Sequence, residues 1–260
     1  LLHTDGKPRP TVILNNFEPM GASRYFPIEE LSEFDVNFIA LCYKDITSDD
    51  GDFTTGIAPI LLPNGQDTDT TCGKIGIWAW ANMRVMDYAL TLPETDAKNV
   101  AIVGHSRLGK TALVTGMLDS RFKYVISNDS GCSGASITRA KEGEHIDFIT
   151  KTFPFWFCKN YTNYIDESKL TFDQHMLLAT IAPRTLIVGS AWDDEWADPD
   201  AEYLGCVAAS KAWENLGLTG FVHPDRLPTV GSVFDEGNVC YQIRPDGHYL
   251  SRRDWNVYFD

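Results

Sequence analysis

One stretch, residues 100–113, limits the fold more than any other part of the chain. It reads Val-Ala-Ile-Val-Gly-His-Ser-Arg-Leu-Gly-Lys-Thr-Ala-Leu. The first four residues are all apolar, as in a strand that is covered on both faces. Helical spacing begins near Leu108, so the buried strand turns through Gly104-His105-Ser106 directly into a helix. A strand–turn–helix unit of this kind is typical of a mostly parallel sheet with helices on both faces.

The same alternation continues along the chain, where short apolar runs bounded by turn residues are followed by segments of helical period. We expect strands at residues 11–15, 36–41, 100–103, 124–127, 185–189 and 239–243. We expect helices at residues 75–91, 108–118, 174–181, 202–216 and 250–258. This order predicts an α/β fold, a three-layer αβα sandwich around a mostly parallel central sheet.

The organisation of the chain favours one domain. Its 260 residues contain no internal repeat and no linker rich in Pro, Gly or Ser, so we predict a single catalytic domain over residues 1–260. Between about residues 131 and 172 the periodicity is lost and aromatic residues are concentrated. That segment is too long for an ordinary connection, and we interpret it as an insertion over the working edge of the sheet.

Composition excludes several partners. The 22 Lys and Arg residues against 36 Asp and Glu residues give a formal net charge of −14. A chain this acidic repels nucleic acid and anionic membrane surfaces. Apolar runs stay short of the roughly 18 residues that a membrane span requires. The six cysteines are scattered without a CxxC pair, so we expect no metal site.

The turn at Ser106 suggests nucleophilic catalysis. In an α/β-hydrolase the nucleophile lies on a strained strand–turn–helix elbow, and the helix N-terminus stabilises the negative charge that develops in the reaction. The usual motif has Gly two positions after the nucleophile. Here Leu108 occupies that position and Gly109 follows it, so the match to the general motif is incomplete.

The same residues also match a phosphate-binding loop, with Gly104, four residues, then Gly109-Lys110-Thr111. This alternative predicts a P-loop nucleotide-binding protein. His105, Arg107 and Leu108 are bulky for a phosphate cradle, and the loop follows at least two expected strands instead of the first. A late histidine, in Asp246-Gly247-His248 after the last expected strand, favours the hydrolase, because Ser, acid, His is the hydrolase chain order.

A serine–histidine–acid triad then assigns the roles. Ser106 attacks a carbonyl carbon, His248 transfers the proton, and a carboxylate orients the imidazole ring. Two acids compete for the third position. Asp129 follows the expected strand at 124–127, and Asp194 follows the next one at 185–189; we favour Asp194. The remaining histidines are interpreted as satisfied surface or core groups: His3, His105, His145, His175 and His223.

At this point the chain resembles a known family, the glucuronoyl esterases of carbohydrate esterase family 15. The resemblance rests first on Gly104-His105-Ser106-Arg107-Leu108-Gly109-Lys110, because these enzymes also place Arg after the nucleophile. Further matching segments are Trp78-Ala79-Trp80, Ser127-Asn128-Asp129-Ser130-Gly131-Cys132, Gly143-Glu144, Phe153-Pro154-Phe155-Trp156-Phe157, Phe172-Asp173-Gln174-His175-Met176-Leu177, Trp196-Ala197-Asp198-Pro199 and Asp246-Gly247-His248 with Asp254-Trp255. Many family members have Glu at the position of Asp129, whereas some use an acid after the next strand, where Asp194 lies.

The resemblance implies an α/β-hydrolase that cleaves esters of (4-O-methyl-)glucuronic acid in glucuronoxylan, such as lignin–carbohydrate links, through a covalent acyl-enzyme. Arg107 would support the oxyanion. Lys110, Glu144 and Trp196 would bind the sugar, with Trp156 as a further candidate. It also implies a secreted monomer that needs no cofactor, and a chain from which the N-terminal part of the fold is missing. The nearest alternative is another carbohydrate esterase, such as an acetyl xylan esterase.

Overall fold

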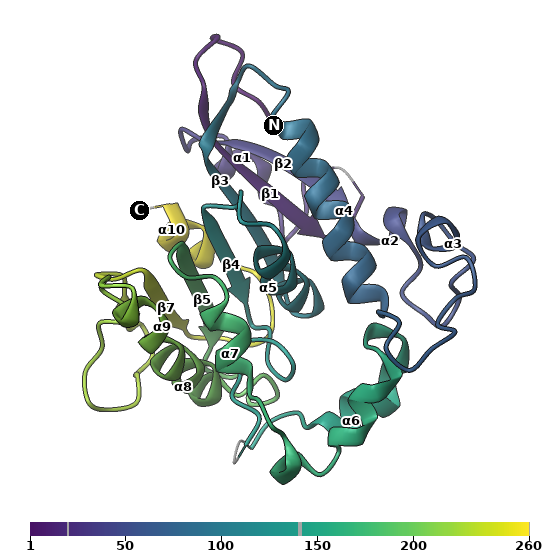
Figure 1. Ribbon diagram of the computed structural model, residues 1–260. Helices are drawn as coiled ribbons and strands as arrows, with labels where there is room; N and C mark the ends of the chain where they lie inside the picture. Colours follow the sequence, from purple (N-terminus) through teal and green to yellow (C-terminus); the bar gives the residue numbers. More distant parts are fainter. Residues whose placement is uncertain (20, 140–141, 260) are drawn as a thin grey trace.

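A computed structural model describes residues 1–19, 21–139 and 142–259 (Figure 1). Its centre is a seven-stranded sheet with the order β2-β1-β3-β4-β5-β7-β6. All neighbouring strands are parallel except β6 and β7, which pair antiparallel. The strands are β1 (Arg9–Asn16), β2 (Asn37–Cys42), β3 (Thr95–His105), β4 (Tyr124–Asn128), β5 (Thr185–Ala191), β6 (Val233–Phe234) and β7 (Val239–Arg244).

Helices cover both faces of this sheet. The α-helices are α1 (Ile28–Leu31), α2 (Tyr43–Ile46), α3 (Ala58–Leu61), α4 (Lys74–Ala89), α5 (Arg107–Leu118), α6 (Ile146–Thr152), α7 (Gln174–Ala179), α8 (Pro199–Ala209), α9 (Lys211–Asn215) and α10 (Arg252–Phe259). Three short 3₁₀ helices lie between α6 and α7: η1 (Pro154–Trp156), η2 (Lys159–Tyr164) and η3 (Glu167–Lys169).

Alternating side chains of the central strands form two separate cores. Ile13 and Ile102 pack with residues of α4, α5 and α7 on one face, and Val12 and Val103 pack with α1 and α10 on the other. Figure 1 shows α4, α5 and α7 in front of the sheet and α10 behind it. Since successive side chains of a strand point to opposite faces, both faces of β1 and β3 are buried. The three-layer arrangement predicted from the sequence is therefore confirmed.

Two differences from the expected elements have local causes. The helix expected at 202–216 begins at Pro199, because Asp198 accepts a hydrogen bond from the Ala201 N–H (3.0 Å) and Pro fits the first helical position. It is interrupted at Ser210, whose hydroxyl accepts a hydrogen bond from the Phe221 N–H (2.9 Å). The two-residue strand β6 was not expected; it is too short to give a periodic signal.

The segment between β4 and α7 forms a third core at the carboxyl ends of the strands. Ile146, Ile149 and Trp156 pack there with Trp78 of α4 and Leu108 of α5. The segment is thus anchored to the helix that follows Ser106. No described helix combines the length and apolarity that a membrane span needs.

Candidate active site

Ser106 lies on a strained turn between β3 and α5. Its φ of 58° and ψ of −126° are unusual for a residue with a side chain. The Ser106 N–H donates to the carbonyl of Asn128 (2.9 Å), which fixes the turn against the end of β4. A Cβ on Gly104 would lie 1.9 Å from the carbonyl oxygen of Leu108, so the turn requires glycine there. The serine therefore stands at the N-terminal end of a twelve-residue helix, where the helix dipole favours negative charge.

His248 and Asp194 come together from two different loops. Asp194 follows β5, His248 follows β7, and His248 Nδ1 lies 2.6 Å from Asp194 Oδ2. The imidazole side chain is 45% exposed, whereas the carboxylate side chain is only 5% exposed. His248 and Ser106 line one cavity of about 190 Å³. With Nδ1 bound to the carboxylate, Nε2 is the ring nitrogen left to exchange a proton with the serine.

Asp129, the competing acid, is bound elsewhere. It is fully buried after β4, and its Oδ2 accepts a hydrogen bond from Arg244 Nη2 (3.0 Å). Arg244 Nε also donates to Asp254 Oδ2 (2.8 Å), so one guanidinium bridges two buried carboxylates. Burial raises the pKa of Asp129 well above its usual value, although the positive charge of Arg244 opposes this rise. Asp129 lines the cavity, but the hydrogen bond to His248 is made by Asp194.

His105 is the satisfied core histidine that the sequence predicts. Its Nδ1 lies 2.8 Å from Asn128 Oδ1, and burial, reinforced by nearby His248, holds the pKa of His105 well below its usual value. The fold also packs it against His248, with ring centroids 4.5 Å apart and the ring planes tilted by 45°. One ligand-type atom from each of His105, Asp129 and His248 lies within 4.8 Å of the others, the arrangement of a candidate metal site. The Arg244 guanidinium already supplies positive charge to Asp129, so we assign no metal to this cluster.

Two cationic side chains from α5 reach the same cavity. Arg107 forms an ion pair with Asp49, and its guanidinium lies over the ring of Trp156 at 4.7 Å. Lys110 is buried, one helical turn after Ser106, and donates to the carbonyl of Ser130. Both line the cavity, and for Lys110 this agrees with its spacing of one helical turn from Ser106.

Glu144, Trp196 and Trp156 form the rest of the predicted set, and they also line this cavity. The Glu144 N–H donates to the carbonyl of Trp196 (2.9 Å), which holds the two residues side by side. Glu144 is buried, whereas the Trp196 side chain stays largely exposed. Trp156 is buried and stacks on Phe153 with centroids 3.8 Å apart, so its ring belongs to the wall of the cavity.

Sequence reasoning did not identify several residues of the site. Phe153, Ser130, Gly131 and Ala197 line the cavity without having been predicted to do so. Arg244, which fixes Asp129, lies four residues before His248 and carries no signal of its own in the sequence. Asp49 carries no sequence signal, because it lies in an acidic loop more than fifty residues before Ser106 and far from any motif.

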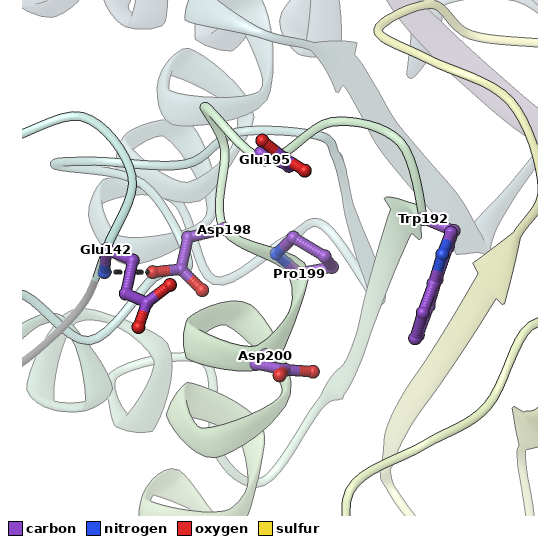
Figure 2. Close-up of a pocket in the computed structure, with 6 residues that line it drawn as sticks. All are labelled: Glu142, Trp192, Glu195, Asp198, Pro199 and Asp200. Carbon is purple, nitrogen blue, oxygen red and sulfur yellow. Dashed lines mark hydrogen bonds between the residues drawn. The ribbon is translucent and has the colours of Figure 1, made fainter.

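A second cavity, of about 400 Å³, lies beside the loop that carries Asp194 and Trp196. Figure 2 shows the residues that line it: Glu142, Trp192, Glu195, Asp198, Pro199 and Asp200. Asp198 also accepts a hydrogen bond from the Glu142 N–H (2.8 Å), drawn as a dashed line in Figure 2. Burial, with the charges of Asp198 and Glu142, raises the pKa of Asp200. Among the residues that the structure describes, this lining carries no basic side chain, whereas the Ser106 cavity contains Arg107 and Lys110.

A parallel sheet between two helical layers, with a serine elbow and a late histidine at its carboxyl end, defines an α/β-hydrolase. Comparison with known proteins then gives the family. The family model for fungal glucuronyl esterases matches residues 38–217, well over half of the chain. The chain therefore belongs to the glucuronyl esterase family.

Individual relatives agree with this assignment. Carbohydrate esterase MZ0003, from an unknown prokaryotic organism, is 42% identical over 189 residues, covering 72% of this chain and 43% of that protein. The 4-O-methyl-glucuronoyl methylesterase of Podospora anserina is 31% identical over 222 residues, covering 81% of this chain and 44% of that protein. The chain thus spans less than half the length of these two relatives.

Solved structures match over nearly the whole chain. A glucuronoyl esterase from Solibacter usitatus has a TM-score of 0.89 at 32% identity and covers 97% of this chain and 73% of its own. A family 15 glucuronoyl esterase from Teredinibacter turnerae has a TM-score of 0.89 at 26% identity and covers 99% of this chain and 66% of its own. The α/β-hydrolase prediction is therefore confirmed. The segment that contains Gly104, Lys110 and Thr111 is the nucleophile turn of a hydrolase, and the alternative of a phosphate-binding loop is wrong.

Proposed function

We propose that this chain is a serine esterase that cleaves esters of (4-O-methyl-)glucuronic acid. The observation that carries the proposal is the bond between His248 Nδ1 and Asp194 Oδ2 at a cavity shared with Ser106 on its strained elbow. Family membership supplies the substrate class, since curated relatives are named 4-O-methyl-glucuronoyl methylesterases.

The reaction has two acyl transfers. Ser106 Oγ attacks the ester carbonyl carbon while His248 Nε2 takes the hydroxyl proton, and Asp194 stabilises the resulting imidazolium. The carbonyl oxygen becomes an oxyanion, which the cationic side chain and the N–H of Arg107 stabilise. Collapse breaks the bond to the alcohol, which leaves with the proton from His248. Water, deprotonated by His248, then attacks the acyl-enzyme and releases the glucuronate and Ser106.

The walls of the cavity suit a sugar acid. Lys110 and Glu144 are buried polar groups at the cavity, placed to bond sugar hydroxyls, and the exposed Trp196 ring offers a stacking surface. The ring of Trp156 also lines the cavity. Asp129 is held by Arg244 and also lines the cavity, whereas the carboxylate that orients His248 is that of Asp194.

The wider setting follows from the family. We assign glucuronoxylan and lignin–carbohydrate esters as the natural substrates, with secretion as the route to them. The chain acts as a monomer and the chemistry runs on side chains alone. The catalytic domain covers residues 1–260, with residues 131–172 as an insertion over the cavity.

The test is release of alcohol from the methyl ester or benzyl ester of glucuronic acid. We expect wild-type protein to hydrolyse both, and Ser106→Ala to lower kcat by at least about 10³-fold. Ser120→Ala, at an exposed serine two residues beyond the end of α5, is the matched control and keeps wild-type rates. Hydrolysis of acetylated xylan without hydrolysis of glucuronate esters would replace the proposal with an acetyl xylan esterase.

A further inference from the structure

Asp49 is a half-buried carboxylate that three donors of the site share. Its Oδ2 accepts hydrogen bonds from Arg107 Nη1 and from the Tyr43 hydroxyl (2.9 Å). Its Oδ1 accepts one from Trp156 Nε1 (2.8 Å). Both Arg107 and Trp156 line the Ser106 cavity, but Asp49 is not among its described lining residues. The carboxylate therefore stands one layer behind the cavity wall.

The loop that presents Asp49 is itself fixed. Lys74, fully buried at the first turn of α4, donates from Nζ to Thr47 Oγ1 (2.8 Å) and to the carbonyl of Asp52 (2.5 Å). Burial lowers the pKa of Lys74, while the neighbouring acidic side chains oppose that shift. A Cβ on Gly56 would lie 1.9 Å from the carbonyl oxygen of Ile46, so the loop closes tightly on itself. Asp49 is thus held in place before any substrate binds.

Arg107 depends on this carboxylate for its orientation. Aromatic rings surround its guanidinium, with Trp156 at 4.7 Å, Phe153 at 5.4 Å and Phe17 at 5.8 Å. Such rings attract a cation without fixing the direction of its N–H groups. Within residues 1–19, 21–139 and 142–259, Asp49 is the only carboxylate that forms an ion pair with Arg107.

We propose that Asp49 is a positioning residue that holds Arg107, and with it the Trp156 wall, in the orientation needed to stabilise the oxyanion on the substrate of Ser106. This inference rests on the proposed function. A donor that is already oriented does not need to reorganise when the negative charge develops, so it lowers the free energy of the transition state. Loss of Asp49 should therefore lower kcat and leave KM nearly unchanged.

The first experiment compares Asp49→Asn with Asp50→Asn. Asp50 is exposed on the same loop, and in the described part of the chain its side chain accepts hydrogen bonds from Ser48 and Asp52 of that loop, so its substitution is the matched control. Asn can still accept the bond from Trp156, so the loop keeps its fold while the ion pair to Arg107 is lost. We expect Asp49→Asn to lower kcat about 10- to 100-fold and Asp50→Asn to change it less than twofold. An Asp49→Asn enzyme within twofold of wild type would overturn the proposal.

A double-mutant cycle separates positioning from general structure. If Asp49 acts through Arg107, then Asp49→Asn has almost no further effect on kcat in an Arg107→Ala background. An equal loss in both backgrounds would show that Asp49 acts otherwise. The cycle is measured on methyl glucuronate and on 4-nitrophenyl acetate, because every ester forms the same oxyanion. If the wild-type protein hydrolyses 4-nitrophenyl acetate but not methyl glucuronate, the proposed sugar specificity is wrong. The double-mutant cycle on the acetate ester then still tests the role of Asp49.

Discussion

The carboxyl ends of β4 and β5 each carry an aspartate next to a histidine, and the two ends differ in what holds the carboxylate. Beyond β4, Asp129 is fully buried and paired with Arg244. Beyond β5, Asp194 is paired with His248, whose side chain is 45% exposed. Both aspartates thus lie just after a parallel strand. The partner that each carboxylate meets decides what it does.

The difference has a physical basis in β7 and its neighbours. Arg244 ends β7 and is bound between Asp129 and Asp254 of α10. The end of β4 is therefore part of a buried charge network in which both carboxylates pair with the Arg244 guanidinium. At the end of β5, Asp194 is instead bound to His248, on which the imidazolium forms during the reaction. The β4 end is built for stability and the β5 end for proton transfer.

The largest expected effect tests this contrast directly. We predict that Asp194→Asn lowers kcat on methyl glucuronate by about 10³- to 10⁴-fold, because the imidazole loses its orientation and the charge that stabilises it. Asp129→Asn should lower kcat at most about tenfold. Both are measured at a temperature where circular dichroism shows each variant folded. The reverse order would make Asp129 the triad acid, and equal losses would mean that the two share the role.

Stability should show the opposite contrast. Arg244→Gln leaves Asp129 and Asp254 buried without their common cation, which we expect to cost about 3–5 kcal/mol of unfolding free energy. Urea denaturation measures this loss. Arg226→Gln, at an exposed position without an ion pair in the described part of the chain, serves as control and should cost less than about 0.5 kcal/mol. A loss below about 1 kcal/mol for Arg244→Gln would show that the network contributes little.

The fold and many residues of the candidate site could be predicted from the sequence, for identifiable physical reasons. Continuous apolar runs located all six longer strands, since a strand covered on both faces needs them. The late histidine and the elbow at Ser106 followed from chain order. Helix α8 began three residues earlier than expected, although Asp198-Pro199 is a clear start signal.

The partners of the Asp129 and Asp194 carboxylates could not be predicted from the sequence. Asp129 and Asp194 occupy equivalent places in the sequence pattern, each just after an apolar run. Only the three-dimensional arrangement, in which β5 pairs with β7, brings Arg244 to Asp129 and His248 to Asp194. Asp49 is a stronger case, because nothing near it in sequence suggests contact with Arg107. Tertiary contacts of single polar residues leave no periodic trace.

Glu202 of α8 connects the two ends and gives the smallest expected effect. Its carboxylate accepts hydrogen bonds from the Ser130 and Gly131 N–H groups beyond β4 (2.8 and 2.9 Å) and from the Ser190 hydroxyl on β5 (2.6 Å). Burial raises the pKa of Glu202 to about 7, although these donors oppose the rise. The pKa is thus higher in the folded than in the unfolded state, so folding favours the protonated form.

The contribution of Glu202 to stability is therefore complete below about pH 4.5 and is lost as the pH rises through about 7. We expect a total loss on the order of 3 kcal/mol, measured as the unfolding free energy in urea between pH 5 and pH 8. Glu202→Gln carries no titrating group, so its pH dependence should be flatter than that of wild type by this amount, whatever constant offset the amide introduces. Parallel pH profiles would mean that the hydrogen bonds from both strand ends keep the carboxylate ionised throughout, and that it joins the β4 and β5 ends as a permanent charge.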